Sequence, residues 1–242
     1  MNKVKFVLFA AGISLALVFI FSCSSDDIGG GDKSSSSNGG GNGIVYGDTV
    51  YYGNETYLTV VIGNQTWMAR NLNYNASGSR CYNDDPANCK QYGRLYDWAT
   101  AMGIGIRYNS EKWGGNYEKH RGICPSGWHI PSNTDWWELL NYVGNGNYKA
   151  AGRYLNAKKG WNDYKGESCN GEDKYGFSAL PGGNFDALPG SSGFINGGDS
   201  GLWWYPGERD SSAYYWYIGC AGTIGSGDSR KSNLNSVRCL KD

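Results

Sequence analysis

The chain has 242 residues, with 22 basic and 22 acidic side chains, so its formal net charge is zero. No basic stripe appears, which argues against nucleic acid as a partner. Gly (38), Tyr (19) and Trp (10) are frequent, which predicts a core of aromatic rings on a turn-rich backbone rather than long aliphatic helices.

The start of the chain predicts export and a lipid anchor. Lys3 and Lys5 precede an apolar run that ends at Cys23, and this is the layout of a secretory signal peptide over residues 1–22. A transmembrane anchor is the alternative, because the run is almost long enough to span a bilayer. The string IFSC at its end resembles a bacterial lipobox, which implies that Cys23 is acylated and holds the protein to a membrane.

A tether is expected to follow the anchor. The stretch SSDDIGGGDKSSSSNGGGNG cannot offset the entropy of ordering, so residues 23–45 are predicted to form a flexible Gly/Ser linker. Its first letters, SSDD, resemble the acidic signal that sends lipoproteins to the cell surface in some Gram-negative bacteria. We therefore expect a lipid-anchored protein of the outer membrane or cell surface, with one domain over residues 46–242.

The first half of this domain predicts a strand meander and then a helix. Gly53-Asn54 and Gly63-Asn64 interrupt β-rich runs between residues 49 and 74, and such dipeptides suit tight hairpin turns. The next string, YGRLYDWATAMGI, predicts a helix, because four apolar side chains follow helical spacing: Leu95, Trp98, Ala99 and Met102.

The stretch CPSGWHIPSNTDWWELL, residues 124–140, predicts a second helix. Ser132 and Asp135 form a helix-start signal, in which the serine oxygen accepts a backbone N–H and the acid favours the positive end. One apolar face follows: Trp136, Leu139, Leu140 and Val143. His129 lies just before this helix and is expected to be a packed imidazole rather than a catalytic one.

A third helix is expected in NYKAAGRYLNA, residues 147–157. Beyond it, four strings read as short strands joined by Gly/Ser loops: GFSALPGG, SGLWWYP, SAYYWYIGCAG and NSVRCLKD. Helices early and strands late, after a hairpin sheet, predict an α+β domain.

Seven cysteines are present, and lipidation of Cys23 leaves six. An even number in an exported chain indicates three disulfides. The spacing favours the pairs Cys81–Cys89, Cys124–Cys239 and Cys169–Cys220. The first closes a turn-forming stretch, the second ties the chain end to its middle, and the third is what remains. A zinc site is disfavoured, because no C-x-x-C pair exists and the chain has two histidines.

Five ordered strings resemble one family: VVIGNQTWMARNLNY, YGRLYDWATAM, CPSGWHIPSNTDWWELL, YGFSALPGG and SVRCLKD. They are similar to the Fibrobacter succinogenes major paralogous domain over residues 46–242. No biochemical activity is established for that family as a whole, so the resemblance implies membership without a mechanism.

The string GWHIPSNTDWWELL with a terminal VRC also resembles the C-type-lectin-like superfold, a likeness that the sulfatase-modifying fold shares. This resemblance implies two to three short helices around irregular, mostly antiparallel sheets, in a loop-rich, disulfide-stapled domain whose termini lie close together. A Cys124–Cys239 bridge fits that topology. The cysteine oxidase activity of the sulfatase-modifying fold needs a late pair of reactive cysteines, and Cys220 stands alone in IGCAG.

Two patterns are candidate ligand sites. The triplet WND, residues 161–163, coincides with a calcium and sugar contact of C-type lectins, and Asp163 is the residue that could hold a metal there. Its usual companion tripeptide is missing, so neither calcium nor another cofactor is expected. The aromatic clusters of the late strands supply candidate sugar-stacking residues: Trp203, Trp204, Tyr214 and Trp216. Neighbouring strand residues point to opposite faces, so we expect core packing for most of these rings and a carbohydrate platform of one or two exposed ones.

No catalytic constellation stands out. The glutamates show no spacing that singles out a glycosidase pair, and there is no G-x-S-x-G elbow. We therefore predict a non-catalytic extracellular domain that binds polysaccharide or a surface glycoconjugate. The alternatives are a structural or protein-interaction module in adhesion or envelope assembly, and an undetected hydrolase or oxidase. Exposed coplanar rings would favour the first reading, a flat apolar patch the second, and a deep pocket with two facing carboxylates the third.

Overall fold

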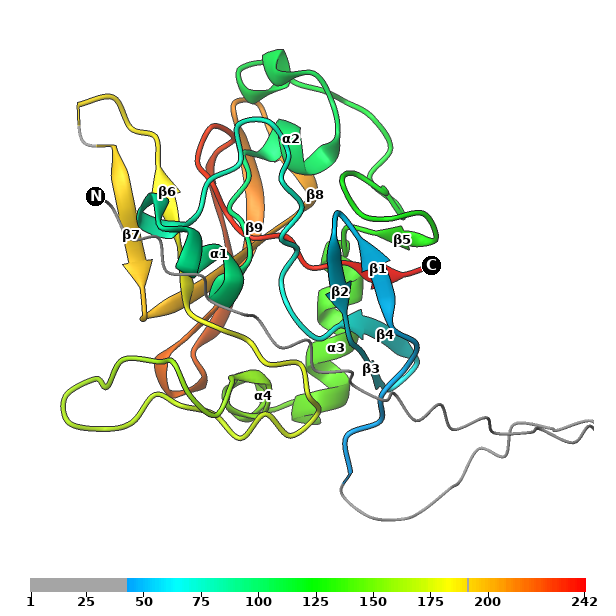
Figure 1. Cartoon of the computed structure of the whole chain (residues 1–242), viewed down its shortest axis with the longest axis vertical. Coiled ribbons are helices and arrows are strands. Elements are labelled where there is room, and N and C mark those ends of the chain that lie inside the picture. Colours follow the sequence, from blue (N-terminus) through cyan, green and yellow to red (C-terminus); the bar gives the residue numbers. More distant parts are fainter. Residues whose placement is uncertain (1–42, 191) are drawn as a thin grey trace, which may run out of the picture. The chain divides into compact units, whose positions relative to one another are not determined.

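Both Gly-Asn turns form hairpins in the computed structural model, which describes residues 43–190 and 192–242 (Figure 1). Gly53, Asn54 and Gly63 adopt positive φ values of 60°, 64° and 62°, a conformation that is cheap for glycine and tolerated by asparagine. The turns join four strands in pairs: β1 (Val50–Tyr52) with β2 (Glu55–Tyr57), and β3 (Thr59–Ile62) with β4 (Gln65–Met68). The predicted hairpins are confirmed, but they do not form one meander, because β1 and β2 make a separate two-stranded sheet and β3 and β4 belong to another.

The predictions made for the signal peptide, for Cys23 and for nearly all of the tether lie outside the described residues. Within the described ranges, no helix is long and apolar enough to cross a membrane.

The chain end completes the sheet that the second hairpin starts. β11 (Leu240–Lys241) lies between β4 and β5 (Trp128–His129) in a four-stranded sheet of order β3-β4-β11-β5. Both of its pairings are antiparallel, Leu240 with Trp67 and Leu240 with His129. Figure 1 shows the red C-terminal strand beside the blue N-terminal ones. The last residues therefore hold the start of α3 against the first strands.

A larger, five-stranded sheet occupies the second half, in the order β10-β9-β8-β6-β7. Its strands are β6 (Gly182–Asp186), β7 (Gly193–Gly197), β8 (Ser200–Arg209), β9 (Ser212–Gly219) and β10 (Ile224–Arg230). All pairs are antiparallel except β6 with β8. Of the four predicted strands, SGLWWYP and SAYYWYIG match β8 and β9. The other two strings are largely irregular, because their backbone N–H groups bond to distant chain segments instead of to a neighbouring strand.

Four α-helices lie among the described residues: α1 (Pro86–Tyr92), α2 (Trp98–Met102), α3 (Asn133–Gly144) and α4 (Tyr148–Leu155). The prediction for α3 is confirmed with its complete capping box between Ser132 and Asp135. The helix expected around Leu95 begins only at Trp98, because the Asp97 side chain caps it by accepting from the Thr100 N–H. Three short 3₁₀ helices complete the set: η1 (Tyr82–Asp84), η2 (Ile106–Asn109) and η3 (Cys220–Gly222).

Three disulfides staple the domain, and they are the pairs that the spacing favoured: Cys81–Cys89, Cys124–Cys239 and Cys169–Cys220. The first encloses η1 and the start of α1, where the sequence suggested only a turn. The second joins the segment before β5 to β11. The third ties η3 to the long segment that follows α4.

Two hydrophobic clusters form the core, and β8 contributes to both. Trp203 enters the cluster under α3, whereas its neighbour Trp204 enters the cluster under α2, because successive strand residues point to opposite faces. Trp136 of α3 lies at the centre of the first cluster, with ring centroids 5.2 Å from Trp67 and 5.7 Å from Trp203. The coarse prediction of an aromatic-cored α+β domain is confirmed.

Candidate functional site

The tryptophans expected to stack on sugar lie in the core. Trp203 and Trp204 are 0% exposed and Trp216 is 3% exposed. Their indole N–H groups donate to acceptors inside the protein over 2.7 to 3.1 Å. The idea that these three rings form a binding surface is wrong, because the two core clusters cover both faces of β8 and the inner face of β9.

Tyr214 is half-buried, and its ring faces inward as well. It stacks on Tyr205, with ring centroids 5.7 Å apart and planes within 11°. Tyr205 is itself 8% exposed. This stacked pair packs against the first core cluster, so it offers no free flat face of two rings to a ligand.

The WND triplet is divided between core and surface. Trp161 is buried, and its indole N–H donates to the Ala179 carbonyl over 3.1 Å. Asn162 donates to Asp199 Oδ1 over 3.1 Å, and Asp163 is exposed. Within the described ranges, no group of three or more His, Cys, Asp or Glu side chains is placed to hold a metal ion. Asp163 is therefore not part of such a group.

A polar hollow of about 730 Å³ lies beside α4. We call it the α4 pocket. Its polar walls come from helix α4, from the segment that follows the helix, and from η3. The side chains that give it its chemistry are Asn147, Lys149, Arg153, Tyr154, Asn156, Glu167, Asn170 and Glu172.

Close backbone contacts fix the walls of the α4 pocket. A Cβ at Gly152 would lie 2.3 Å from the Gly222 carbonyl oxygen, so α4 can approach η3 only through glycine. The segment at residues 171–174 then runs back along the end of α4, with four backbone hydrogen bonds of 2.8 to 3.0 Å to residues 153–157. The Cys169–Cys220 disulfide joins these two walls.

Charges of both signs line the α4 pocket. Arg153 Nε lies 3.0 Å from Glu172 Oε1 on one wall. No ion pair of the described residues engages Lys149 or Glu167, so both are available to a ligand.

A buried amide, Asn156, is among the residues that line the α4 pocket. Asn156 is 0% exposed, and its Nδ2 donates to the Gly219 carbonyl over 3.2 Å. Its Oδ1 has no hydrogen-bond partner among the described residues. A buried acceptor without a donor costs free energy. A hydroxyl group or a water molecule that reached Asn156 Oδ1 would donate the missing hydrogen bond.

This arrangement suits a neutral, hydroxyl-rich ligand. Amides and carboxylates offer donors and acceptors in one small volume, which is what a molecule with many hydroxyl groups requires. The Tyr154 ring adds an apolar surface. None of these residues was singled out as a site from the sequence, because they come from two separate stretches, 147–156 and 167–172. The only local signal is Asn147, whose side chain caps α4 by accepting from the Ala150 N–H over 3.0 Å.

Comparison with protein families places the chain. The family model described as the Fibrobacter succinogenes major domain matches residues 60–241. The chain belongs to this family. The matched part of the Fibrobacter succinogenes major domain runs from β3 to β11 and contains the three disulfides and the α4 pocket. No match was found among curated proteins or among solved structures.

Proposed function

We propose that this Fibrobacter succinogenes major domain is a non-catalytic extracellular module that binds a polysaccharide or glycoconjugate in the α4 pocket. The observation that carries the proposal is the pocket itself: one hollow of about 730 Å³ combines amides, both charge signs and a tyrosine ring. A concave pocket in which several polar groups converge is a candidate binding site of a domain. The proposal moves the site from the buried tryptophans to α4.

The disulfides and the start of the chain support a ligand outside the cell. Three disulfides are typical of exported chains, and the start of the chain carries a signal-peptide pattern that ends at Cys23. We therefore propose a lipoprotein that is held to the outer membrane or cell surface through Cys23. The C-type-lectin-like fold remains part of the proposal, supported by the pairing of β11 with strands from the first half.

The test is a retention experiment with the full chain, exported by a bacterial host and purified in detergent. Insoluble cellulose, insoluble xylan and a glycan array serve as probes. We expect saturable retention on at least one of them. A double variant, Lys149→Met with Glu167→Gln, should bind at least tenfold more weakly, because it removes the two charges of the pocket that have no ion-pair partner.

The matched control carries the same two changes elsewhere. Lys112→Met with Glu118→Gln alters exposed residues of a different loop and should bind like the wild type. Retention on no glycan, or equal binding by the α4 pocket variant, contradicts the proposal. Release of reducing sugar from xylan or cellulose would favour a hydrolase instead, since Glu167 and Glu172 line the same pocket.

A protein-interaction module is the second candidate, and exposed apolar side chains near the first hairpin favour it. Val45, Tyr46 and Leu58 are 58%, 61% and 56% exposed. Tyr46 and Leu58 line a common hollow of about 310 Å³. Exposed apolar groups that share a hollow are typical of protein docking. Chemical cross-linking on intact cells, with Leu58→Ser as the variant that loses the cross-linked product, tests this candidate.

A further inference from the structure

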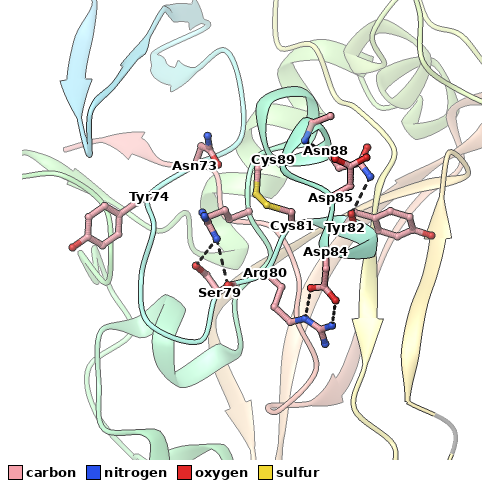
Figure 2. Close-up of a disulfide and its surroundings, with 12 residues drawn as sticks. Asn73, Tyr74, Ser79, Arg80, Cys81, Tyr82, Asp84, Asp85, Asn88 and Cys89 are labelled. Carbon is pink, nitrogen blue, oxygen red and sulfur yellow. Dashed lines mark hydrogen bonds and ion pairs between the residues drawn. A yellow bond between two sulfur atoms is a disulfide. The ribbon is translucent and has the colours of Figure 1, made fainter.

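A second polar pocket, of about 260 Å³, lies beside the Cys81–Cys89 disulfide. We call it the Tyr82 pocket. Figure 2 shows its disulfide side, where the Tyr82 ring points away from the bridge and Asn88 donates to the Tyr82 carbonyl over 2.9 Å. The remaining lining residues that carry its chemistry are Asn83, Tyr92 and Asn162.

The Tyr82 pocket offers hydrogen-bonding groups without charge. Its lining consists of tyrosine, asparagine and glycine residues. Burial and the nearby Tyr82 side chain raise the pKa of Tyr92. The Asn83 side chain is exposed, on a backbone with φ of 55°. Amides and phenols of this kind donate and accept alternately, which suits the hydroxyl groups of a neutral sugar.

Lining residues of the two pockets come together at Trp161. Asn170, which lines the α4 pocket, accepts from the backbone N–H of Trp161 over 3.2 Å. The residues on either side of Trp161, which are Gly160 and Asn162, both line the Tyr82 pocket. The two hollows are therefore neighbours.

The segment between the pockets is held at both ends. On the α4 side, Cys169 is bonded to Cys220. On the other side, the Asn162 N–H donates to the Gly198 carbonyl over 2.8 Å. Figure 1 shows this segment as the long loop that leaves α4. A loop fixed at both ends keeps the spacing of two binding sites constant, which lowers the entropy cost of binding a long ligand.

The same segment carries an exposed ring. Tyr164 is 60% exposed, and it pairs with Glu167, which lines the α4 pocket. The face of an aromatic ring carries partial negative charge and favours contact with the C–H groups of a sugar. Lys165 Nζ lies over one face of the Tyr164 ring, 5.1 Å from its centroid, so a ligand that extends beyond the α4 pocket would contact the other face.

We propose that the two pockets are subsites for one glycan chain, so that the ligand is an extended oligosaccharide or polysaccharide rather than a single terminal sugar. The inference rests on the proposed function and specifies its substrate class. The α4 pocket takes one part of the chain, the Tyr82 pocket takes another, and Tyr164 contacts the stretch between them. Affinity therefore rises with chain length, because each subsite adds its own contacts to a single binding event.

Isothermal titration of the full chain tests this inference. The probes are cello-oligosaccharides and xylo-oligosaccharides of two and of six residues. We expect the six-residue ligand of the preferred series to bind at least tenfold more tightly than the two-residue ligand. Tyr92→Phe with Asn83→Gly removes one hydroxyl and one amide from the Tyr82 pocket, and glycine tolerates the positive φ at this position. This variant should lose most of the length dependence and bind the short ligand normally.

Tyr164→Ala should weaken binding of the six-residue ligand at least threefold. Its matched control is Tyr51→Ala, which removes another exposed tyrosine (72% exposed) from β1 and should leave the affinity for the six-residue ligand unchanged. Equal affinity for short and long ligands, or normal length dependence in the Tyr82 pocket variant, overturns the two-subsite inference but leaves glycan binding intact. Absence of binding to any oligosaccharide overturns both.

Discussion

At the scale of single residues, the buried carboxylate of Glu208 on β8 holds the loop around residues 113–117. The Glu208 side chain accepts from the Trp113 and Gly114 N–H groups over 2.9 and 2.7 Å and from the Tyr117 hydroxyl over 2.6 Å. Lys231 donates to the same carboxylate, and both of these side chains are fully buried. Burial by itself would raise the pKa of Glu208, but the N–H groups and the Lys231 ammonium outweigh it and lower the pKa to about 2.

Glu208→Gln should destabilise the protein strongly at neutral pH. The change leaves the Lys231 ammonium buried without its counter-charge, which typically costs about 3–5 kcal/mol. Because the folded-state pKa lies below the ordinary value of 4.5, the stabilisation is present above pH 4.5 and is lost as the pH falls toward 2. Urea unfolding across this window measures both effects.

Glu118→Gln is the control for this experiment, since Glu118 is exposed. A Glu208→Gln variant whose free energy of unfolding lies within about 0.5 kcal/mol of the wild type would contradict the prediction that the Glu208–Lys231 pair stabilises the fold.

His129 titrates in the opposite sense. It is buried, as expected from the sequence, with Nδ1 2.8 Å from Asp242 Oδ1 and Nε2 3.5 Å from Asp135 Oδ2. Burial lowers the pKa of His129, but the two carboxylates outweigh it and the net pKa is raised above 6.5. The stabilisation is therefore complete below pH 6.5 and is lost as the pH rises through the raised pKa.

His129→Gln should abolish this pH dependence. We expect the free energy of unfolding of the wild type to fall as the pH rises above 6.5, and the variant to show a flat profile in the same range. His120→Gln is the matched control, because it removes the other histidine and should keep the slope. Parallel profiles of unfolding free energy against pH for the wild type and His129→Gln would contradict the pairing of His129 with Asp135 and Asp242.

At the scale of elements, capping side chains decide where helices begin. Asp85, Asp97, Ser132 and Asn147 precede the four α-helices, and each accepts a backbone N–H from the first turn. Such bonds satisfy amide groups that have no partner within the helix. They explain why α2 starts at Trp98 rather than at Leu95, although both residues fit the apolar spacing.

Ser132→Ala should destabilise α3 and, with it, the first core cluster. Loss of a serine cap costs about 1 kcal/mol, and in a domain of this size that lowers the melting temperature by about 2–4 °C. Thermal unfolding followed by circular dichroism measures the shift. Ser226→Ala, on the exposed side of the edge strand β10, should leave the melting temperature unchanged. A similar loss in both variants would mean that the cap contributes nothing specific.

At the scale of the whole molecule, disulfides that close loops of very different length stabilise the fold. Cys124–Cys239 closes a separation of 115 residues, whereas Cys81–Cys89 closes a separation of 8. From the entropy that each bridge removes from the unfolded chain, we expect the long loop to stabilise the fold by about 5 kcal/mol and the short one by about 2.5 kcal/mol. The long bridge also keeps β11 between β4 and β5.

Replacing both cysteines of the long bridge with alanine should therefore lower the free energy of unfolding by about 2.5 kcal/mol more than replacing both cysteines of the short bridge. Urea unfolding of the two double variants under oxidising conditions provides the comparison, and each serves as the other's control. An equal or larger loss in the Cys81→Ala with Cys89→Ala variant would show that the long bridge does not hold the domain together.

The sequence by itself determined the local features of this protein. The Gly-Asn hairpins and the α3 capping box follow from turn chemistry and helix-end hydrogen bonding, which act over short stretches. Cysteine spacing favoured the pairs Cys81–Cys89 and Cys124–Cys239 and left Cys169–Cys220 as the remaining pair. Family membership is equally local, because it rests on ordered strings. The family match over residues 60–241 confirms it.

Only the tertiary structure decided which side chains face solvent and which share a pocket. The sequence left open which one or two of the clustered rings are exposed, and packing from both sides buries both Trp203 and Trp204. Arg238 is likewise buried, against the Asn71 side chain, with no sequence signal. The α4 pocket brings together side chains from separate stretches of the chain. Burial and such long-range proximity depend on how distant segments pack, and no local pattern encodes that information.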